Sequence, residues 1–218
     1  PTNGLQNRHI ALWQSHGFYY EPKLNRWEWQ RARCLQTVED LYTQSFVLPY
    51  LVPMLENAGA NVLLPRERDC QTAEIIIDND GCLNTNSTYT EHTADKVWRQ
   101  GTGKGFAHLR PQYIDFENPF KEGTFRIAET VKKGKESTAE WIPEIPQNGQ
   151  YAVYVSYQTV PNSSDDALYT VYHKGGVSQF KVNQKMGGGT WVYLGTFGFD
   201  AGKSNACKVT LSNRSAKA

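Results

Sequence analysis

From about residue 71 onward, apolar and polar residues alternate with a period of two, and this pattern constrains the fold more than any other feature. Gly, Asn, Asp and Pro residues separate the alternating segments at intervals of about 8–15 residues. Successive side chains of a strand point to opposite faces, so the alternation predicts strands with one buried face. Repeated short strands of this kind are typical of an antiparallel β-sandwich or jelly roll. The predicted strands are 73–80, 124–131, 139–145, 151–158, 168–175, 177–184, 190–199 and 207–213.

Two of these segments carry more detailed expectations. In 151–158, alternation places the odd-numbered residues from Tyr151 to Tyr157 on one face and Tyr154 on the other. Between 168 and 184, Gly175 and Gly176 are expected to form the turn of a tight hairpin.

The first seventy residues follow a different pattern. A short apolar strand at 8–16 precedes a charged, tryptophan-rich loop, a helix over 37–60 and a second strand at 61–69. Thr37 is the expected N-cap, and Gly59 is a suitable stop for the helix. Pro49 and Pro53 each lack a backbone donor and should bend or break the helix. Strand, helix and strand together predict one βαβ unit with parallel strands.

The expected fold class is therefore mixed: a partial α/β (βαβ) layer in residues 1–70 and an antiparallel β-sandwich or jelly-roll domain in residues 71–218. The net charge of +1 gives no field for binding nucleic acid. The sequence has no apolar run of about 18 residues, so it predicts no transmembrane helix. The six Trp, twelve Tyr and nine Phe residues fit an extracytoplasmic β-rich protein. The cysteines allow either a Cys70–Cys82 bridge or free buried thiols.

His16 and Glu39 are the candidate metal ligands. His16 ends the first strand and Glu39 begins the helix, so both are expected at the carboxyl edge of the sheet, where α/β proteins bind ligands. A catalytic zinc site needs three protein ligands and an open position for water. The alternative is that Glu39 only favours the helix dipole and that His16 is a loop residue.

Residues 8–69 resemble the N-terminal half of the zinc-dependent N-acetylmuramoyl-L-alanine amidases. The resemblance is carried by "QSHG", by an acid at the start of a long helix, and by "AGA" followed by a strand with Arg and Asp. It implies that His16 and Glu39 bind zinc and that peptidoglycan is the substrate. The third ligand and the catalytic Glu of that family have no match here. This chain alone is therefore expected to be inactive, with the rest of the amidase-like domain lying beyond Ala218.

Residues 72–213 resemble the golvesin or xanthan-lyase carbohydrate-binding-like β-sandwich. The motifs are "WIPEIPQNGQYAVYV", "YTVYHKGG", "VNQ" and "GGTWVYLGTFGF". The combination is similar to Bacteroidetes proteins that carry the name xanthan lyase, with the sandwich inserted in the amidase-like domain. It implies a secreted, periplasmic or cell-surface protein that contacts peptidoglycan or another polysaccharide.

Six residues in hairpin-forming sequence are candidates for a glycan-binding surface, because sugars stack on exposed aromatic rings and hydrogen-bond to amides. The structural alternative puts Trp191, Tyr193 and Phe197 together in the core and pairs His173 and Gln184 across the hairpin. Asp165 and Asp166 lack the further spaced acids of a calcium loop. The six candidates are Trp191, Tyr193, Tyr172, His173, Asn183 and Gln184.

The favoured function is cell-wall or polysaccharide processing outside the cytoplasm. One alternative is a non-catalytic glycan-binding or scaffolding module with a vestigial amidase segment. Another is a module associated with polysaccharide lyase activity, although no cluster of a base and a charge-neutralising group stands out in the sequence.

Overall fold

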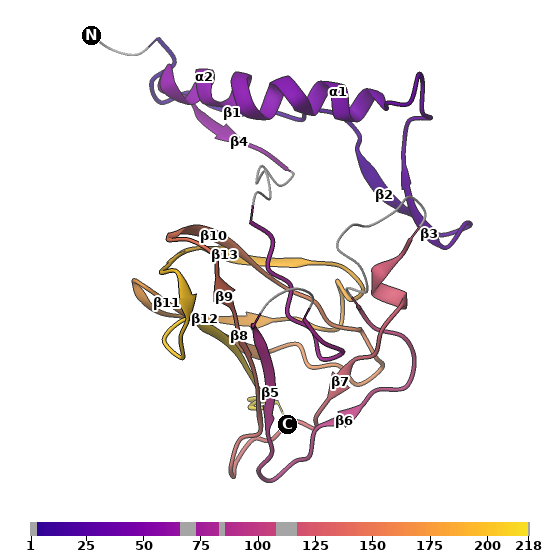
Figure 1. The fold of residues 1–218 in the computed structure, drawn as a ribbon, viewed down its shortest axis with the longest axis vertical. Coiled ribbons are helices and arrows are strands. Elements are labelled where there is room, and N and C mark those ends of the chain that lie inside the picture. Colours follow the sequence, from indigo (N-terminus) through magenta and orange to yellow (C-terminus); the bar gives the residue numbers. More distant parts are fainter. Residues whose placement is uncertain (1–3, 66–72, 83–85, 108–116, 218) are drawn as a thin grey trace. The chain divides into compact units, whose positions relative to one another are not determined.

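The computed structural model describes residues 4–65, 73–82, 86–107 and 117–217. The chain forms two compact units (Figure 1). Unit 1 comprises Pro1–Gln71 and Ile114–Glu117, and unit 2 comprises Thr72–Tyr113 and Asn118–Ala218.

Unit 1 contains the expected parallel strand pair. Strand β1 (His9–Ala11) pairs with β4 (Asn61–Leu63), with His9 opposite Asn61. The helical segment lies between them in the chain, so the βαβ order and the parallel pairing are confirmed. Both strands are short, with three residues each.

The helical segment is not one regular helix. It consists of α1 (Glu39–Phe46), the π-helical turn η1 (Val47–Leu51) and α2 (Val52–Asn57). The amide of Val52 donates to the carbonyl of Val47, five residues back. Because Pro49 and Pro53 have no amide hydrogen to donate, a wider turn accommodates them where a bend or a break was expected.

The predicted N-cap of this helical segment is wrong, whereas its predicted C-terminal stop is confirmed. Val38 is the N-cap and makes no side-chain capping bond, whereas Thr37 pairs with Cys34 in an isolated bridge. The predicted cap at Thr37 is therefore wrong. Gly59 follows the last turn with φ 95°, a left-handed conformation that suits glycine, as expected for the stop.

A hairpin replaces the loop expected after His16. Strand β2 (Phe18–Glu21) pairs antiparallel with β3 (Arg26–Trp29). Asn25 ends the connecting turn with φ 53°, which Asn tolerates better than most residues. Charged and aromatic residues alternate in β3, and β2 is rich in aromatic residues, which together were the sequence signal for the hairpin.

Unit 2 is an antiparallel β-sandwich. Its larger sheet has five strands in the order β12-β11-β15-β8-β5. The second layer is a ribbon of β10 (Gly149–Val155) and β13 (Val192–Phe199). The five strands of the larger sheet are β5 (Thr88–His92), β8 (Thr138–Ile142), β11 (Ala167–His173), β12 (Gly176–Val182) and β15 (Lys208–Ser212).

The core lies between these two layers. Val171 and Tyr169 of β11 are almost fully buried, and they belong to the same core clusters as Phe199 and Val155 of the ribbon. Tyr151, Val153 and Tyr157 pack against these clusters, which confirms the predicted inward face of 151–158. The mixed fold class is thus confirmed.

Smaller elements complete unit 2. Strands β6 (Arg99–Gln100) and β7 (Arg126–Ile127) form one pair. Strands β9 (Glu144–Ile145) and β14 (Gly202–Lys203) form another, and η2 (Pro119–Lys121) is a 3₁₀ turn.

Several predicted strands differ from the structure. Within 73–80, Asp78 forms an isolated bridge with Gly81 in place of a strand, and 124–131 is reduced to β7. Pro143 separates β8 from β9, because proline cannot donate to the ladder.

Three further points concern turns, edges and thiols. The hairpin between β11 and β12 has Lys174 and Gly175 in its turn, since His173 already pairs with Gly176. Strand β5 was not predicted, because "TYTEH" has no apolar alternation and lies at the sheet edge. The Cys70–Cys82 alternative involves Cys70, which lies outside the described residues.

Candidate functional site

A β-bulge in β13 determines which aromatic side chains reach the surface. Tyr154 pairs with Tyr193 and Val153 pairs with Gly195, so Leu194 is the extra residue. One extra residue reverses the alternation along a strand. Residues 191 and 193 therefore lie on the outer face of the ribbon, whereas Phe197 contributes to the core.

Gly195 is required at this bulge. Its φ is 159°, and a Cβ built on it would lie 2.7 Å from Cζ of Phe197. No side chain fits at that distance without displacing the Phe197 ring. The glycine therefore allows the reversal that brings Trp191 and Tyr193 outward.

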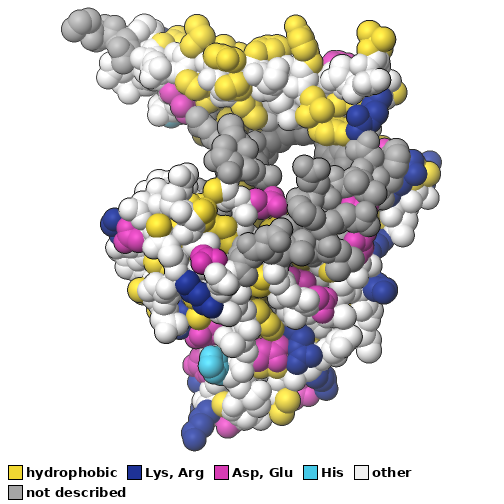
Figure 2. All heavy atoms as spheres, viewed as in Figure 1, with side chains coloured by type: hydrophobic (Ala, Val, Ile, Leu, Met, Phe, Trp, Pro, Cys, Tyr) yellow, Lys and Arg dark blue, Asp and Glu magenta, His cyan; other side chains and the backbone are white. Residues whose placement is uncertain are grey.

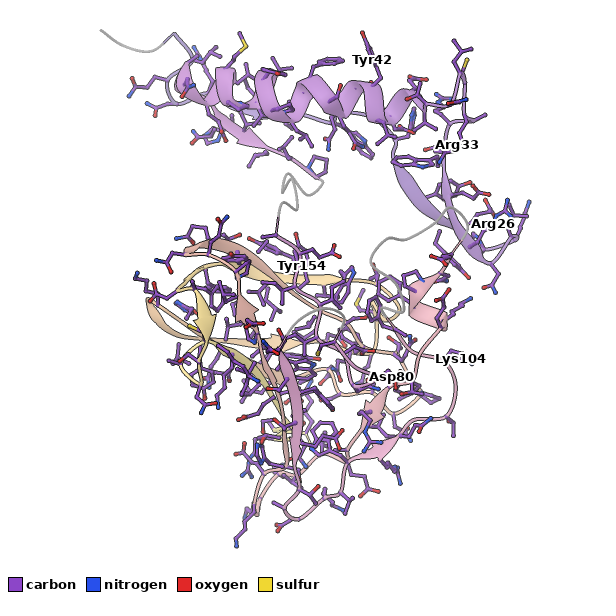
Figure 3. All side chains as sticks on the ribbon, in the orientation of Figure 1. Arg26, Arg33, Tyr42, Asp80, Lys104 and Tyr154 are labelled. Carbon is purple, nitrogen blue, oxygen red and sulfur yellow. The ribbon has the colours of Figure 1, made fainter. Side chains whose placement is uncertain are left out.

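We call Tyr154, Trp191 and Tyr193 the aromatic face. Tyr193 is 52% exposed and Trp191 is 39% exposed. The rings of Tyr154 and Tyr193 lie 5.3 Å apart, and Tyr154 lies on the ribbon side of unit 2 (Figure 3). The hydroxyl groups of Tyr193 and Thr196 are 2.7 Å apart, which helps to orient the Tyr193 ring.

The Trp191 ring is held from below by two buried phenylalanines. The ring centroids of Phe106 and Phe120 lie 4.8 and 5.8 Å from that of Trp191. Both Phe side chains are buried. Trp191 therefore has one packed side and one exposed side, and the packing limits the rotamer entropy that a ligand would have to remove.

Tyr172 and His173 do not join this face. Lys208 Nζ lies 5.4 Å from the Tyr172 ring centroid, on the opposite side of β11 from the buried Val171. His173 Nε2 lies 3.1 Å from Ser178 Oγ across the hairpin, and its Nδ1 accepts the Gly175 amide at 3.1 Å. The structural alternative describes His173 correctly.

Asn183 and Gln184 also have partners within their own hairpin. Gln184 donates from Nε2 to the hydroxyl of the buried Tyr169 at 3.0 Å. Asn183 Oδ1 accepts the amide of Lys185 at 3.0 Å. Of the six predicted contacts, the structure thus brings together Trp191 and Tyr193. The alternative that both share the core with Phe197 is wrong, because the bulge separates them.

Tyr154 was missed as part of this surface. Alternation placed Tyr154 on the strand face opposite Tyr151 and Tyr157. That position alone does not indicate a binding site. Its position beside Tyr193 depends on the register of β10 with β13, two strands almost forty residues apart in the chain. The sequence carries no local signal for that register.

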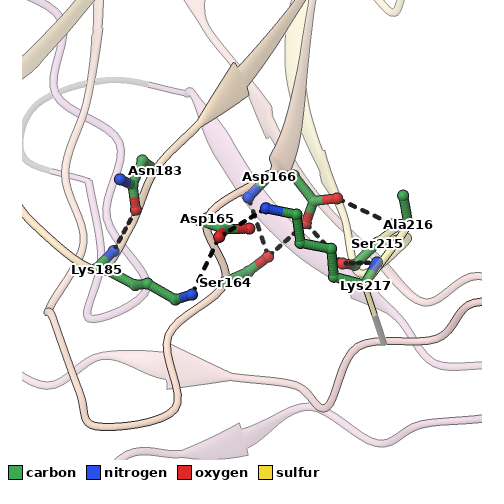
Figure 4. Close-up of polar contacts among 8 residues, drawn as sticks. All are labelled: Ser164, Asp165, Asp166, Asn183, Lys185, Ser215, Ala216 and Lys217. Atoms are coloured by element: carbon green, nitrogen blue, oxygen red, sulfur yellow. Dashed lines mark hydrogen bonds and ion pairs between the residues drawn. The ribbon is translucent and has the colours of Figure 1, made fainter.

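The carboxylates of Asp165 and Asp166 form ion pairs and hydrogen bonds with other residues of this chain (Figure 4). Asp165 pairs with Lys185 at 3.1 Å and with Lys217 at 2.8 Å. Hydrogen bonds, first from Ser215, lower the pKa of Asp166 to about 2. The donors to Asp166 are Ser215 Oγ at 2.6 Å, Ser164 Oγ at 2.7 Å and the Ala216 amide at 2.9 Å.

In unit 1, the carboxylate beside His16 is that of Asp40. Nδ1 of His16 lies 3.9 Å from Oδ1 of Asp40, whose side chain is fully buried. Ser15 Oγ and the Gly17 amide donate to the same oxygen at 2.6 and 2.7 Å. Burial opposes the ionisation of Asp40, but these hydrogen bonds outweigh it and lower the pKa.

Glu39 has a different partner. Its side chain is 65% exposed and lies 3.8 Å from Arg31 Nε. In the described residues, His16 and Glu39 thus have different partners, Asp40 and Arg31. Among the described residues, no three His, Cys, Asp or Glu side chains converge in the manner of a metal site. Zinc binding stays a prediction from the resemblance.

No helix within the described residues is long and apolar enough to cross a membrane.

Three comparisons with known proteins give matches. Xanthan lyase of Bacillus sp. (strain GL1) is 35% identical over 81 residues, which are 37% of this chain and 8% of that enzyme. The solved structure of a Paenibacillus xanthan lyase matches with 24% identity and a TM-score of 0.36, covering 59% of this chain and 13% of that one. Residues 119–218 match the family model of the Golvesin C-terminal domain. Residues 119–218 are therefore similar to that domain, and the chain is similar to a short segment of a xanthan lyase.

Proposed function

We propose that unit 2 is a carbohydrate-binding module and that its aromatic face contacts the polysaccharide. The observation that carries this proposal is the exposed pair of Trp191 and Tyr193, which a bulge turns away from the core. The similarity to the Golvesin C-terminal domain and to a xanthan lyase segment supports a role with polysaccharides.

The chemistry of the face suits a sugar ring. One side of a pyranose presents mainly C–H groups, which carry partial positive charge and pack on the electron-rich face of an aromatic ring. The rings of Trp191 and Tyr193 are already positioned by their neighbours, so binding orders few new side chains.

The role of the whole protein is part of the same proposal. The matched segment is 8% of the curated xanthan lyase, so catalysis by that enzyme does not transfer to this chain. We expect the module to hold a polysaccharide for processing outside the cytoplasm, at the cell surface, in the periplasm or in the medium. Amidase activity on peptidoglycan stays a prediction for a longer protein that supplies the missing ligand and the catalytic Glu.

Alanine substitutions on the aromatic face test the proposal. We expect Trp191→Ala and Tyr193→Ala each to weaken binding about tenfold, which corresponds to ~1.4 kcal/mol. Binding to xanthan, soluble peptidoglycan fragments and uncharged glucans is measured by affinity electrophoresis and calorimetry.

Tyr172→Ala is the matched control, because it removes a tyrosine ring from the other side of the sandwich. It should leave affinity unchanged. The proposal fails if the wild-type chain binds none of these glycans, or if Tyr172→Ala weakens binding as much as Tyr193→Ala does.

A further inference from the structure

A polar pocket lies on unit 2 where β5, β6 and β7 meet the segment at 79–80. It is a shallow depression, open to solvent, with a volume of about 440 Å³. Asp80 lies beside β7 (Figure 3). The lining residues are Asn79, Asp80, Tyr89, Thr90, Glu91, Gln100, Thr124 and Arg126.

One wall of this polar pocket is a neutralised ion pair. Arg126 donates from Nε and Nη2 to the two oxygens of Glu91, at 2.6 and 2.9 Å. The Tyr89 hydroxyl donates to Glu91 at 2.7 Å, and the Tyr89 ring packs against Trp141 with centroids 5.3 Å apart. Because the guanidinium is held in a bidentate pair, its charge is already compensated.

The pocket also carries one uncompensated negative charge among its lining residues. Asp80 accepts the Thr124 amide at 2.5 Å and the Thr124 hydroxyl at 2.6 Å, and Asn79 donates to it at 3.1 Å. These donors orient the carboxylate but are neutral. With Glu91 and Arg126 cancelling, the charged lining residues sum to −1 from Asp80.

The lining therefore favours an uncharged ligand with many hydroxyl groups. Amides, hydroxyls and carboxylates supply donors and acceptors, which suits groups that both donate and accept. The ring of Tyr89 is the one aromatic surface among the lining residues, so an apolar ligand would leave the polar groups unpaired. Among the lining residues, a carboxylated sugar would meet the Asp80 charge, and the one cation there, Arg126, is already paired with Glu91.

We propose that the polar pocket is a second glycan subsite, which binds an uncharged sugar unit and rejects a uronate. This inference rests on the proposed function for the class of ligand, but the pocket is separate from the aromatic face. If both proposals hold, the polar pocket makes the module select uncharged sugar units over uronates.

The test is a residue-resolved NMR titration of the full chain. The probes are methyl glucoside and methyl mannoside, with methyl glucuronide as the charged comparison at equal concentrations. We expect at least one uncharged glycoside to shift the amides of Glu91, Gln100 and Thr124, and the glucuronide to bind there at least about fivefold more weakly. Gln100→Ala, at an exposed position of β6, should reduce the shifts while the fold is retained.

Glu91→Gln tests the selectivity directly. It leaves the shape of the pocket nearly unchanged but releases the charge of Arg126, so the ratio of glucuronide to glucoside affinity should rise about tenfold. Glu136→Gln is the matched control, because it likewise releases an arginine, Arg214 at 2.9 Å, and neither residue lines the pocket. That variant should leave the ratio unchanged.

The outcomes separate the two proposals. Shifts at the aromatic face with none at the pocket overturn the pocket inference and leave the module intact. Equal binding of glucuronide and glucosides in the pocket overturns the selectivity. The absence of shifts with every glycan, in the titrations and the affinity measurements, overturns both proposals.

Discussion

Two aspartates of unit 2 show how their surroundings move the same side chain in opposite directions. Burial, with the nearby charge of Asp80, raises the pKa of Asp78 to about 7. Hydrogen bonds from Ser215 and Ser164 lower the pKa of Asp166 to about 2. Folding therefore favours a proton on the first carboxyl and a charge on the second.

Asp78 makes stability depend on pH in the direction opposite to most carboxylates. The folded chain keeps a proton on Asp78 up to about pH 7, whereas the unfolded chain loses it near the ordinary pKa of 3.8. The free energy of unfolding therefore contains no penalty from Asp78 below about pH 4, and it decreases as the pH rises toward 7. We expect Asp78→Asn to be more stable than wild type at pH 8, by roughly 1–3 kcal/mol, and equally stable at pH 4.

Urea unfolding at five pH values between 4 and 8 measures this effect. Asp200→Asn, at an exposed aspartate paired with Lys174, is the control and should follow the wild-type curve. An Asp78→Asn curve parallel to wild type across this range would show that Asp78 is charged in the folded chain at neutral pH.

Asp166 should give the usual acid sensitivity. Its stabilising contribution is present above the unfolded pKa of 3.8 and is lost as the pH falls toward 2. Asp166→Asn replaces one acceptor oxygen with a donor facing Ser215 or Ala216, so we expect a loss of about 1–2 kcal/mol at pH 7. The loss should shrink toward pH 2, where about half of the folded wild type is protonated at Asp166. Chemical denaturation of both proteins at pH 7, 4 and 2 checks this, and a pH-independent difference would contradict it.

At the scale of elements, strand β13 shows why a simple alternation rule fails. The pattern predicted one face for Trp191, Tyr193 and Phe197, because period-two reasoning assumes that no residue is inserted. The bulge at Leu194 adds one residue and sends the first two outward. The glycine in "YLGTF" was the sequence signal, since an isolated Gly in a strand often marks a bulge.

Gly195→Ala tests the role of the bulge. The new Cβ would meet the Phe197 ring at 2.7 Å and occupy a φ that other residues rarely adopt. We expect a loss of about 1–3 kcal/mol and a changed Trp191 environment. Unfolding curves and tryptophan fluorescence report the two effects.

Gly149→Ala in the paired strand is the control. Its Cβ would meet Tyr151 at an ordinary 3.5 Å, so we expect a change below about 1 kcal/mol. Equal effects of the two substitutions would mean that the strain at Gly195 is not specific to the bulge.

At the scale of the whole molecule, the two units differ in how much apolar surface they bury. Hydrophobic side chains gather along the helical segment of unit 1 (Figure 2). Tyr42, Tyr50 and Met54 are each about two-thirds exposed. A three-residue strand pair and one helical segment offer few partners, whereas the sandwich of unit 2 encloses two core clusters.

We expect the chain to unfold in two transitions, with unit 1 unfolding first. The α-helices of the described residues lie in unit 1, so circular dichroism at 222 nm follows that unit. In a variant with Trp13, Trp27 and Trp29 of unit 1 replaced by phenylalanine, the remaining tryptophans report on unit 2 by fluorescence. Coincident curves from both probes in guanidinium chloride would contradict this prediction, because they would indicate one cooperative unit.

The sequence by itself determined the fold class, most strands of the sandwich and the βαβ order, because alternation, helix periodicity and chain punctuation are local properties. It also named Trp191 and Tyr193 as candidates for a glycan surface, which stays a prediction, but it did not reveal the bulge that exposes them. The tertiary structure decided which side chains meet, because those contacts depend on strand register and on residues distant in the chain. It set Asp40 rather than Glu39 beside His16, placed Tyr154 beside Tyr193, and assembled the polar pocket from three strands and the segment at 79–80. These contacts join residues tens of positions apart, and no local pattern encodes which strands will meet or in which register.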